Sequence, residues 1–76
     1  MWLLRSGADL VGATLSSLPP EYRAALIGKY VDGRTVPEMA GASGRNVKAV
    51  ESQLHRARQA FARVFTLLAR RRGGSE

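Results

Sequence analysis

The sequence predicts an all-α protein, a small four-helix domain that contains a helix-turn-helix and ends in a long helix. Three observations support this fold class. Apolar residues recur at alternating spacings of three and four over residues 46–68, which is the period of an amphipathic helix. Proline and glycine interrupt the rest of the chain at short intervals, as they do between short helices. No segment alternates apolar and polar residues as a half-buried strand does.

Length and composition are those of one small domain. The chain has 76 residues, of which 45% are hydrophobic, so it can bury a single modest core. We divide it into an N-terminal extension or linker at residues 1–8, a folded domain at residues 9–69 and a basic flexible tail at residues 70–76. It has no cysteine, which excludes disulfides, and no apolar run approaches the roughly 20 residues of a membrane span. We expect a cytoplasmic protein without membrane contact.

The first helix is expected to begin at Asp9, because an aspartate side chain can cap a helix N-terminus. Gly12 weakens this helix, since glycine costs a helix interior about 1 kcal/mol relative to alanine. The segment Leu18-Pro19-Pro20 ends it. The apolar positions of this helix are Leu10, Val11, Ala13 and Leu15.

The second helix is expected to begin at Pro20, because the fixed φ of proline suits the first turn of a helix. Asp32 and Gly33 form a turn pair that ends it. We expect both of its tyrosines to be packing residues. Its apolar positions are Tyr22, Ala25, Leu26 and Tyr30.

The third helix is short and has signals at both ends. Thr35 and Glu38 have the spacing of a capping box, in which each side chain bonds the backbone N–H of the other residue. Gly44 suits a left-handed C-terminal cap. Met39 and Ala40 are expected to face inward.

The fourth helix has the strongest signal in the chain. Asn46 is a favoured N-cap, because its side-chain oxygen can accept a backbone N–H of the first turn. The predicted buried stripe consists of Val47, Val50, Leu54, Ala57, Phe61, Val64 and Leu68. Together with the third helix and the turn between them, this helix makes a helix-turn-helix.

The face opposite the stripe is cationic and rich in hydrogen-bonding groups. At 100° per residue it carries Lys48, Ser52, Arg56 and Gln59, with His55 beside them. Residues 1–44 have four basic and four acidic residues, whereas residues 45–76 have eight basic and two acidic residues, a net charge of +6. Such segregation favours a polyanionic partner, because each neutralised phosphate releases counterions. The alternative is that the run of charge is only a solvated helix face. A capped cationic helix after a glycine turn suits a recognition helix in a DNA major groove.

The residue types of this chain argue against an enzyme. The chain has one histidine, no cysteine, no clustered carboxylates and no phosphate-cradling glycine loop. A paired nucleophile and base is therefore absent. We expect no catalytic residue, no cofactor and no metal site.

The segment from Leu18 to Arg58 resembles region 4, the C-terminal promoter-recognition region, of bacterial extracytoplasmic-function (ECF) RNA polymerase sigma factors. The resemblance is ungapped over 41 residues and includes the turn at Gly44. The matching elements are Leu18-Pro19-Pro20, Arg23, Leu26, Lys29-Tyr30-Val31-Asp32-Gly33, Glu38, Ala40, Gly44 and Leu54-His55-Arg56-Ala57-Arg58. Response-regulator DNA-binding domains share the four-helix architecture, but the first and last of these elements argue against them.

The resemblance implies a function in transcription initiation. Such regions bind the upstream, minus-35, promoter element as part of RNA polymerase holoenzyme, with the last helix in the major groove and other surfaces on the flap of the polymerase β subunit. The contacts implied by position are Lys48, Glu51, Ser52, His55 and Arg56, with Arg58 nearby. The helical face assigned above gives Lys48, Ser52, His55 and Arg56 independently.

Departures from the family pattern bear on affinity. The family usually has Lys or Arg where this chain has Glu51, and often Arg where it has Gln53. Glu51 either accepts a hydrogen bond from a cytosine amine, pairs with protonated His55, or orients Arg58. Arg45 replaces an apolar turn residue and is a candidate phosphate contact. Smaller side chains at Ala42 and Ser43 predict looser packing of the third helix.

Two readings of function follow from the sequence. The first is sequence-specific binding of double-stranded promoter DNA by a monomer attached to RNA polymerase core, through the residues Arg45, Lys48, Glu51, Ser52, His55, Arg56, Arg58 and Gln59. The alternative is a protein-interaction module that binds polymerase or an anti-sigma factor and uses DNA weakly. A full sigma factor needs a second, DNA-melting region that 76 residues cannot contain, so the chain is either an excised domain or a natural one-domain fragment. We expect the excised domain.

Overall fold

The fold is all-α, as the sequence predicts. A computed structural model describes the backbone of residues 2–73 and the side chains of residues 9–71. Its elements are α1 (Trp2–Ser16), α2 (Pro20–Leu26), the π-helix η1 (Ile27–Val31), α3 (Val36–Ser43) and α4 (Val47–Gly73). No strand occurs within residues 2–73. No helix in that range has the length and apolar character needed to cross a bilayer.

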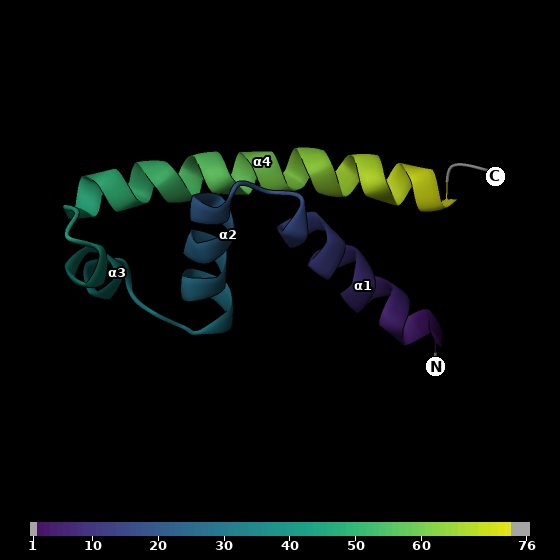
Figure 1. The fold of residues 1–76 in the computed structure, drawn as a ribbon, viewed down its shortest axis with the longest axis horizontal. Helices are drawn as coiled ribbons and strands as arrows, with labels where there is room; N and C mark the ends of the chain where they lie inside the picture. The colour runs from purple at the N-terminus through teal and green to yellow at the C-terminus, as the bar shows by residue number, and fades with distance from the viewer. Residues whose placement is uncertain (1, 74–76) are drawn as a thin grey trace.

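The long helix α4 organises the molecule. It runs the length of the domain, and α3, α2 and α1 contact it in that order from its N-terminal to its C-terminal half (Figure 1). The three shorter helices lie on one side of it, and α1 diverges from it toward the N-terminus (Figure 1). The result is an elongated domain of 45 × 23 × 15 Å. Within residues 2–73, no helix covers the other side of α4 (Figure 1).

Two small apolar clusters hold the shorter helices against α4. The first joins α2, α3 and α4 and consists of Ala25, Ala40, Val50 and Leu54, with Val36 and Met39 packed against it. The second joins α4 to α2 and the segment after α1 and consists of Leu18, Leu26 and Ala57, flanked by Leu15, Tyr22, Ala60, Phe61 and Val64. Both clusters draw on the predicted stripe of α4.

The predicted stripe is confirmed over most of its length. Val50 and Leu54 are each 2% exposed and Ala57 is fully buried. Farther along α4, Phe61, Val64 and Leu68 are half-buried. Val47 is the exception at 40% exposure. It lies in the first turn of α4, next to residues 41–46, all of which are exposed.

The first helix begins earlier than expected. We predicted a linker at residues 1–8 and a cap at Asp9, but α1 begins at Trp2 and Asp9 is an exposed residue in its interior. The segment before Asp9 contains no proline, so nothing in it stops the helix from extending. Thr14 of α1 is fully buried, and the Thr14 hydroxyl donates to the carbonyl of Leu10 at 2.7 Å. Of the apolar positions predicted there, Val11 and Ala13 are exposed.

The last helix ends later than expected. We predicted a flexible tail from residue 70, but α4 continues to Gly73. Arginine and leucine are strong helix formers, and the first residue after Arg70 that disfavours a helix is Gly73 itself. Residues 74–76 of the predicted tail lie outside the described backbone. The domain boundary at residues 9–69 stays a prediction.

The second helical segment starts at Pro20 and stops before Gly33, as predicted, but its second half is a π-helix. The N–H of Asp32 donates to the carbonyl of Ile27 at 2.9 Å, five residues back. This wider turn leaves Tyr30 58% exposed and Val31 71% exposed. Packing of Tyr30 was therefore predicted wrongly, whereas Tyr22 is half-buried in the second cluster.

Candidate nucleic-acid interface

A side-chain cap and a left-handed glycine fix the first turn of α4. The backbone N–H of Ala49 donates to Asn46 Oδ1 at 2.8 Å, which confirms Asn46 as the N-cap. Gly44 has a φ of 72°, and the N–H of the next residue, Arg45, donates to the carbonyl of Ala40 at 3.0 Å. This is the left-handed C-terminal cap that the sequence predicts. It sets the angle between α3 and α4.

The capping box of α3 is also present. The N–H of Thr35 donates to Glu38 Oε1 at 2.8 Å, and the N–H of Glu38 donates to Thr35 Oγ1 at 3.2 Å. The backbone N–H of Thr35, and after it the Thr35 hydroxyl, hold the pKa of Glu38 below its usual range, and the charge of Arg34 adds to this. The start of α3 is thereby fixed by polar groups that are exposed to water.

Five of the predicted site residues gather on one face of α4. Lys48, Ser52, His55, Arg56 and Gln59 are all exposed. Helical periodicity places them within about 100° of arc, opposite the buried stripe. The buried Val50, Leu54 and Ala57 fix that orientation, because rotating α4 would expose them. We call these five residues the DNA-facing set, after the partner that the sequence predicts for them.

Glu51 and Arg58 lie on a flank of α4 instead. Arg58 Nη1 donates to Tyr30 Oη at 3.2 Å, a partner that the sequence did not suggest. This bond turns the guanidinium toward η1 and away from the DNA-facing set. Glu51 is exposed, and seven residues, about 10 Å along the helix axis, separate it from Arg58.

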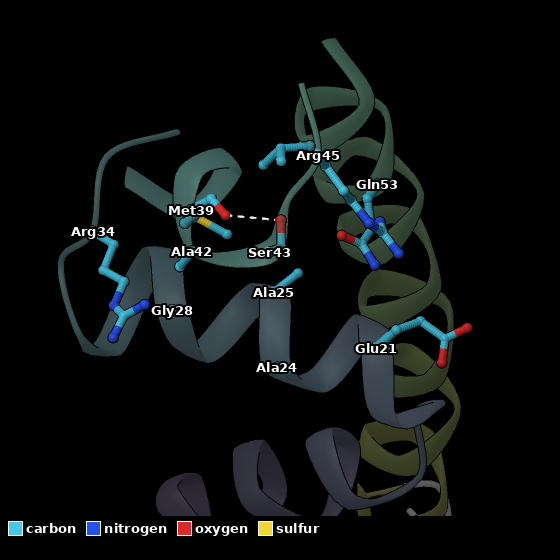
Figure 2. A pocket seen from close by; sticks show the side chains of 11 residues that line it. Glu21, Ala24, Ala25, Gly28, Arg34, Met39, Ala42, Ser43, Arg45 and Gln53 are labelled. Carbon is cyan, nitrogen blue, oxygen red and sulfur yellow. Dashed lines mark hydrogen bonds between the residues drawn. The ribbon is translucent and has the colours of Figure 1, made fainter. Parts of the chain in front are cut away.

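Arg45 lies on the opposite flank, beside a pocket of about 360 Å³ between α2, α3 and α4. Figure 2 shows Arg45 and Gln53 at one edge of this pocket and Arg34 at the other. Small side chains line it, including Ala24, Ala42 and Ser43. The space agrees with the looser packing of the third helix that Ala42 and Ser43 predict.

A second hollow lies where α1, α2, η1 and α4 meet. It has a volume of about 390 Å³ and an almost wholly apolar lining. We call it the apolar groove. Its lining residues are Val11, Leu15, Leu26, Ile27, Tyr30, Val31, Arg58 and Phe61. The groove borders the flank of α4 that carries Arg58, so it is separate from the DNA-facing set.

Two residues of this surface were missed by sequence reasoning. Arg63 is exposed and follows Arg56 by seven residues, which places it on the same face of α4. The heptad spacing was a signal that could have found it. Tyr30 supplies the hydroxyl that holds Arg58, and nothing in the sequence distinguishes this role from packing.

A metal centre has no ligand set within residues 9–71. No group of three His, Cys, Asp or Glu side chains gathers there as metal ligands would. His55, the lone histidine of the chain, is exposed on α4 among Ser52, Arg56 and Gln59. Its two ring nitrogens are therefore available as hydrogen-bonding groups on the DNA-facing set.

Comparisons with known proteins agree with this geometry. The model of the family described as sigma-70, region 4, matches residues 8–61. The chain is 44% identical over 55 residues to the ECF RNA polymerase sigma factor SigE of Mycolicibacterium smegmatis (strain ATCC 700084 / mc(2)155). That match covers 72% of this chain and 21% of the relative, so the chain spans about a fifth of that protein's length. No solved structure matches the chain.

Proposed function

The chain belongs to the sigma-70 region 4 family, in its ECF branch, and from this premise we propose that it recognises the minus-35 element of promoters. The DNA-facing set enters the major groove, and the chain acts as the promoter-reading part of a sigma factor bound to RNA polymerase core. The DNA is double-stranded, and one copy of the domain binds one element.

One observation carries this proposal. Five polar or cationic side chains that can hydrogen-bond to base edges and phosphates are exposed on one face of α4. Buried apolar residues on the opposite face hold α4 against the shorter helices. An α-helix fits the major groove, which is about 12 Å wide. The N-terminal half of α4, which carries all five residues, is the part that the helix-turn-helix projects.

Each residue of the set has a role that its chemistry permits. Arg56 can form a bidentate pair with guanine O6 and N7, and Gln59 can do the same with adenine N6 and N7. Ser52 and His55 supply shorter hydrogen bonds to base edges or phosphates. Lys48, near the start of the helix, is a phosphate contact.

The three predicted residues outside the set take other roles in this proposal. Arg45 contacts phosphate from the turn, since its side chain lies at the edge of α4. Arg58 supports the interface from the flank through Tyr30. Glu51 borders the major groove of the DNA, where it accepts a hydrogen bond from a cytosine amine or pairs with His55.

The apolar groove favours a second, compatible function. Val11, Tyr30 and Val31 are 43%, 58% and 71% exposed, so three large side chains that line this groove are open to solvent, as apolar groups at protein-interaction sites are. We propose that this groove binds the flap of the polymerase β subunit, with an anti-sigma factor as a competing occupant. Because it lies apart from the DNA-facing set, DNA and protein can be bound together.

Duplex binding tests the proposal. Duplexes selected from a random pool by the chain with polymerase core present define a matched site, and a scrambled duplex serves as the mismatched control. We expect Arg56→Ala to weaken matched binding by roughly 1–3 kcal/mol and mismatched binding much less. Equal affinity of the variant and the parent for both duplexes would remove Arg56 from the reading face. Binding that does not weaken as salt rises would favour the protein-interaction alternative.

A further inference from the structure

The cationic face of α4 extends beyond the DNA-facing set. Arg56, Arg63 and Arg70 recur every seven residues, and all three are exposed. Because α4 is one continuous helix to Gly73, they lie on one side of it with a drift of only about 20° per step. None of the three shorter helices lies on that side (Figure 1).

The charge of Arg63 has no acidic neighbour on its own helix. Glu51 is the sole acidic residue between Val47 and Gly73. The residues three and four positions from Arg63, which are the ones a helical side chain reaches, are Gln59, Ala60, Thr66 and Leu67. A helix face stabilised by internal ion pairs would place a carboxylate at one of these positions. The pattern therefore leaves the guanidinium available to an external anion.

The distance along α4 identifies which anion fits. Lys48 to Gln59 spans about 17 Å of helix, which fills a major groove about 12 Å wide and 8.5 Å deep. Arg63 lies about 10 Å beyond Arg56 along α4, and Arg70 lies another 10 Å farther out. With the DNA-facing set in the groove, as the proposed function has it, Arg63 is the next cation along the helix and comes level with the sugar-phosphate edge of the groove, whereas Arg70 is too far out to reach it.

We propose that Arg63 binds a DNA phosphate at the edge of the major groove and so fixes the register of the DNA-facing set. This inference rests on the proposed function. Arginine is suited to the role, because its planar guanidinium can donate two parallel hydrogen bonds to phosphate oxygens. A phosphate contact positions the helix and carries no sequence information of its own.

Salt titration of duplex binding tests the inference, with Arg70 as the matched control. Each phosphate neutralised contributes about 0.9 to the slope of log affinity against log salt. Between 50 and 200 mM salt, Arg63→Ala should therefore lose about 3.5-fold less affinity than the parent chain. At fixed salt it should bind matched and mismatched duplexes more weakly by the same factor. Arg70→Ala, on the same face, should reproduce the parent slope.

The outcomes separate this inference from the function beneath it. A parent chain that shows no salt-dependent duplex binding overturns both. A parent that binds, with Arg63→Ala at the parent slope, overturns the phosphate contact alone. Equal slopes for Arg63→Ala and Arg70→Ala would mean that only net charge matters, which also overturns it. Circular dichroism of both variants should show unchanged helix content, because both side chains lie on the uncovered face.

Discussion

Two glycines three residues apart should respond to alanine in opposite directions. Gly41 is an exposed interior residue of α3, and a Cβ built on it meets no atom within 4 Å. Gly44 also has open space around it, but its φ is 72°. Sterics around the new methyl group are therefore equal, and only the backbone conformation differs between the two sites.

The structure gives the size of each effect. Alanine at Gly41 should stabilise the fold by about 0.5–1 kcal/mol, because it restricts the unfolded chain and suits a helix interior. Alanine at Gly44 enters the left-handed region, where an L-residue costs roughly 1–2 kcal/mol, so this variant should be less stable than the parent by about 1 kcal/mol. For a domain of this size, 1 kcal/mol corresponds to about 4–8 °C in Tm.

Urea and thermal unfolding followed by circular dichroism measure both variants against the parent. We expect Gly41→Ala above the parent in midpoint and Gly44→Ala below it, with unchanged dependence on denaturant. Gly44→Ala should also weaken binding to matched duplexes, because the turn sets the angle of α4. Equal midpoints for the two variants would refute the left-handed turn as the device that joins α3 to α4.

Three further predictions follow from burial, charge and capping. Leu54→Ala should lower the free energy of unfolding by about 2–5 kcal/mol, because Leu54 is 2% exposed. Leu67→Ala on the same helix, at 55% exposure, should change it by less than about 0.5 kcal/mol. Similar losses of stability for the two variants in urea unfolding would contradict the assigned core. Glu51→Lys should raise affinity for all duplexes by adding a cation, as measured by fluorescence anisotropy; a sharp fall for the matched duplex alone would assign Glu51 to base reading. Because the pKa of Glu38 is lowered in the folded state, its contribution to stability is present above the unfolded pKa, about 4.3, and is lost as pH falls through the folded pKa. Glu38→Gln should remove this part of the dependence of unfolding on pH. An unchanged profile of unfolding free energy against pH would show that the capping box is not coupled to folding.

Local signals predicted the internal element boundaries well. Asn46, Gly44 and the Thr35–Glu38 pair all form the bonds or backbone conformation expected of them. Each acts over three or four residues, so the sequence around it contains everything that determines it. The ends of the chain were predicted poorly, because a cap residue such as Asp9 does not stop a helix that favourable residues continue on both sides.

Tertiary features escaped the sequence for a different reason. Thr14 is fully buried because its hydroxyl bonds within its own helix to Leu10, which makes a polar residue compatible with a core position. The π-helix that exposes Tyr30 arises from a single widened turn. The spacing of apolar residues in the sequence does not indicate this turn. The exposure of the DNA-facing set was predictable because one helix carries all five residues, whereas the apolar groove needed the meeting of four elements.

Polar groups at both ends of α3 contribute to the angle between α3 and α4. Around α3 the buried apolar contact consists of the small Ala25 and Ala40 against Val50 and Leu54, and a pocket of about 360 Å³ lies beside it. The larger α3 side chains that pack against it, Val36 and Met39, are only half-buried, so dispersion contacts constrain α3 less than a fully buried interface would. The capping box before α3 and the glycine turn after it add a constraint through directional bonds. A change that weakens either one should therefore alter DNA binding more than it alters the contacts of α1 and α2 with α4, which depend on a different cluster.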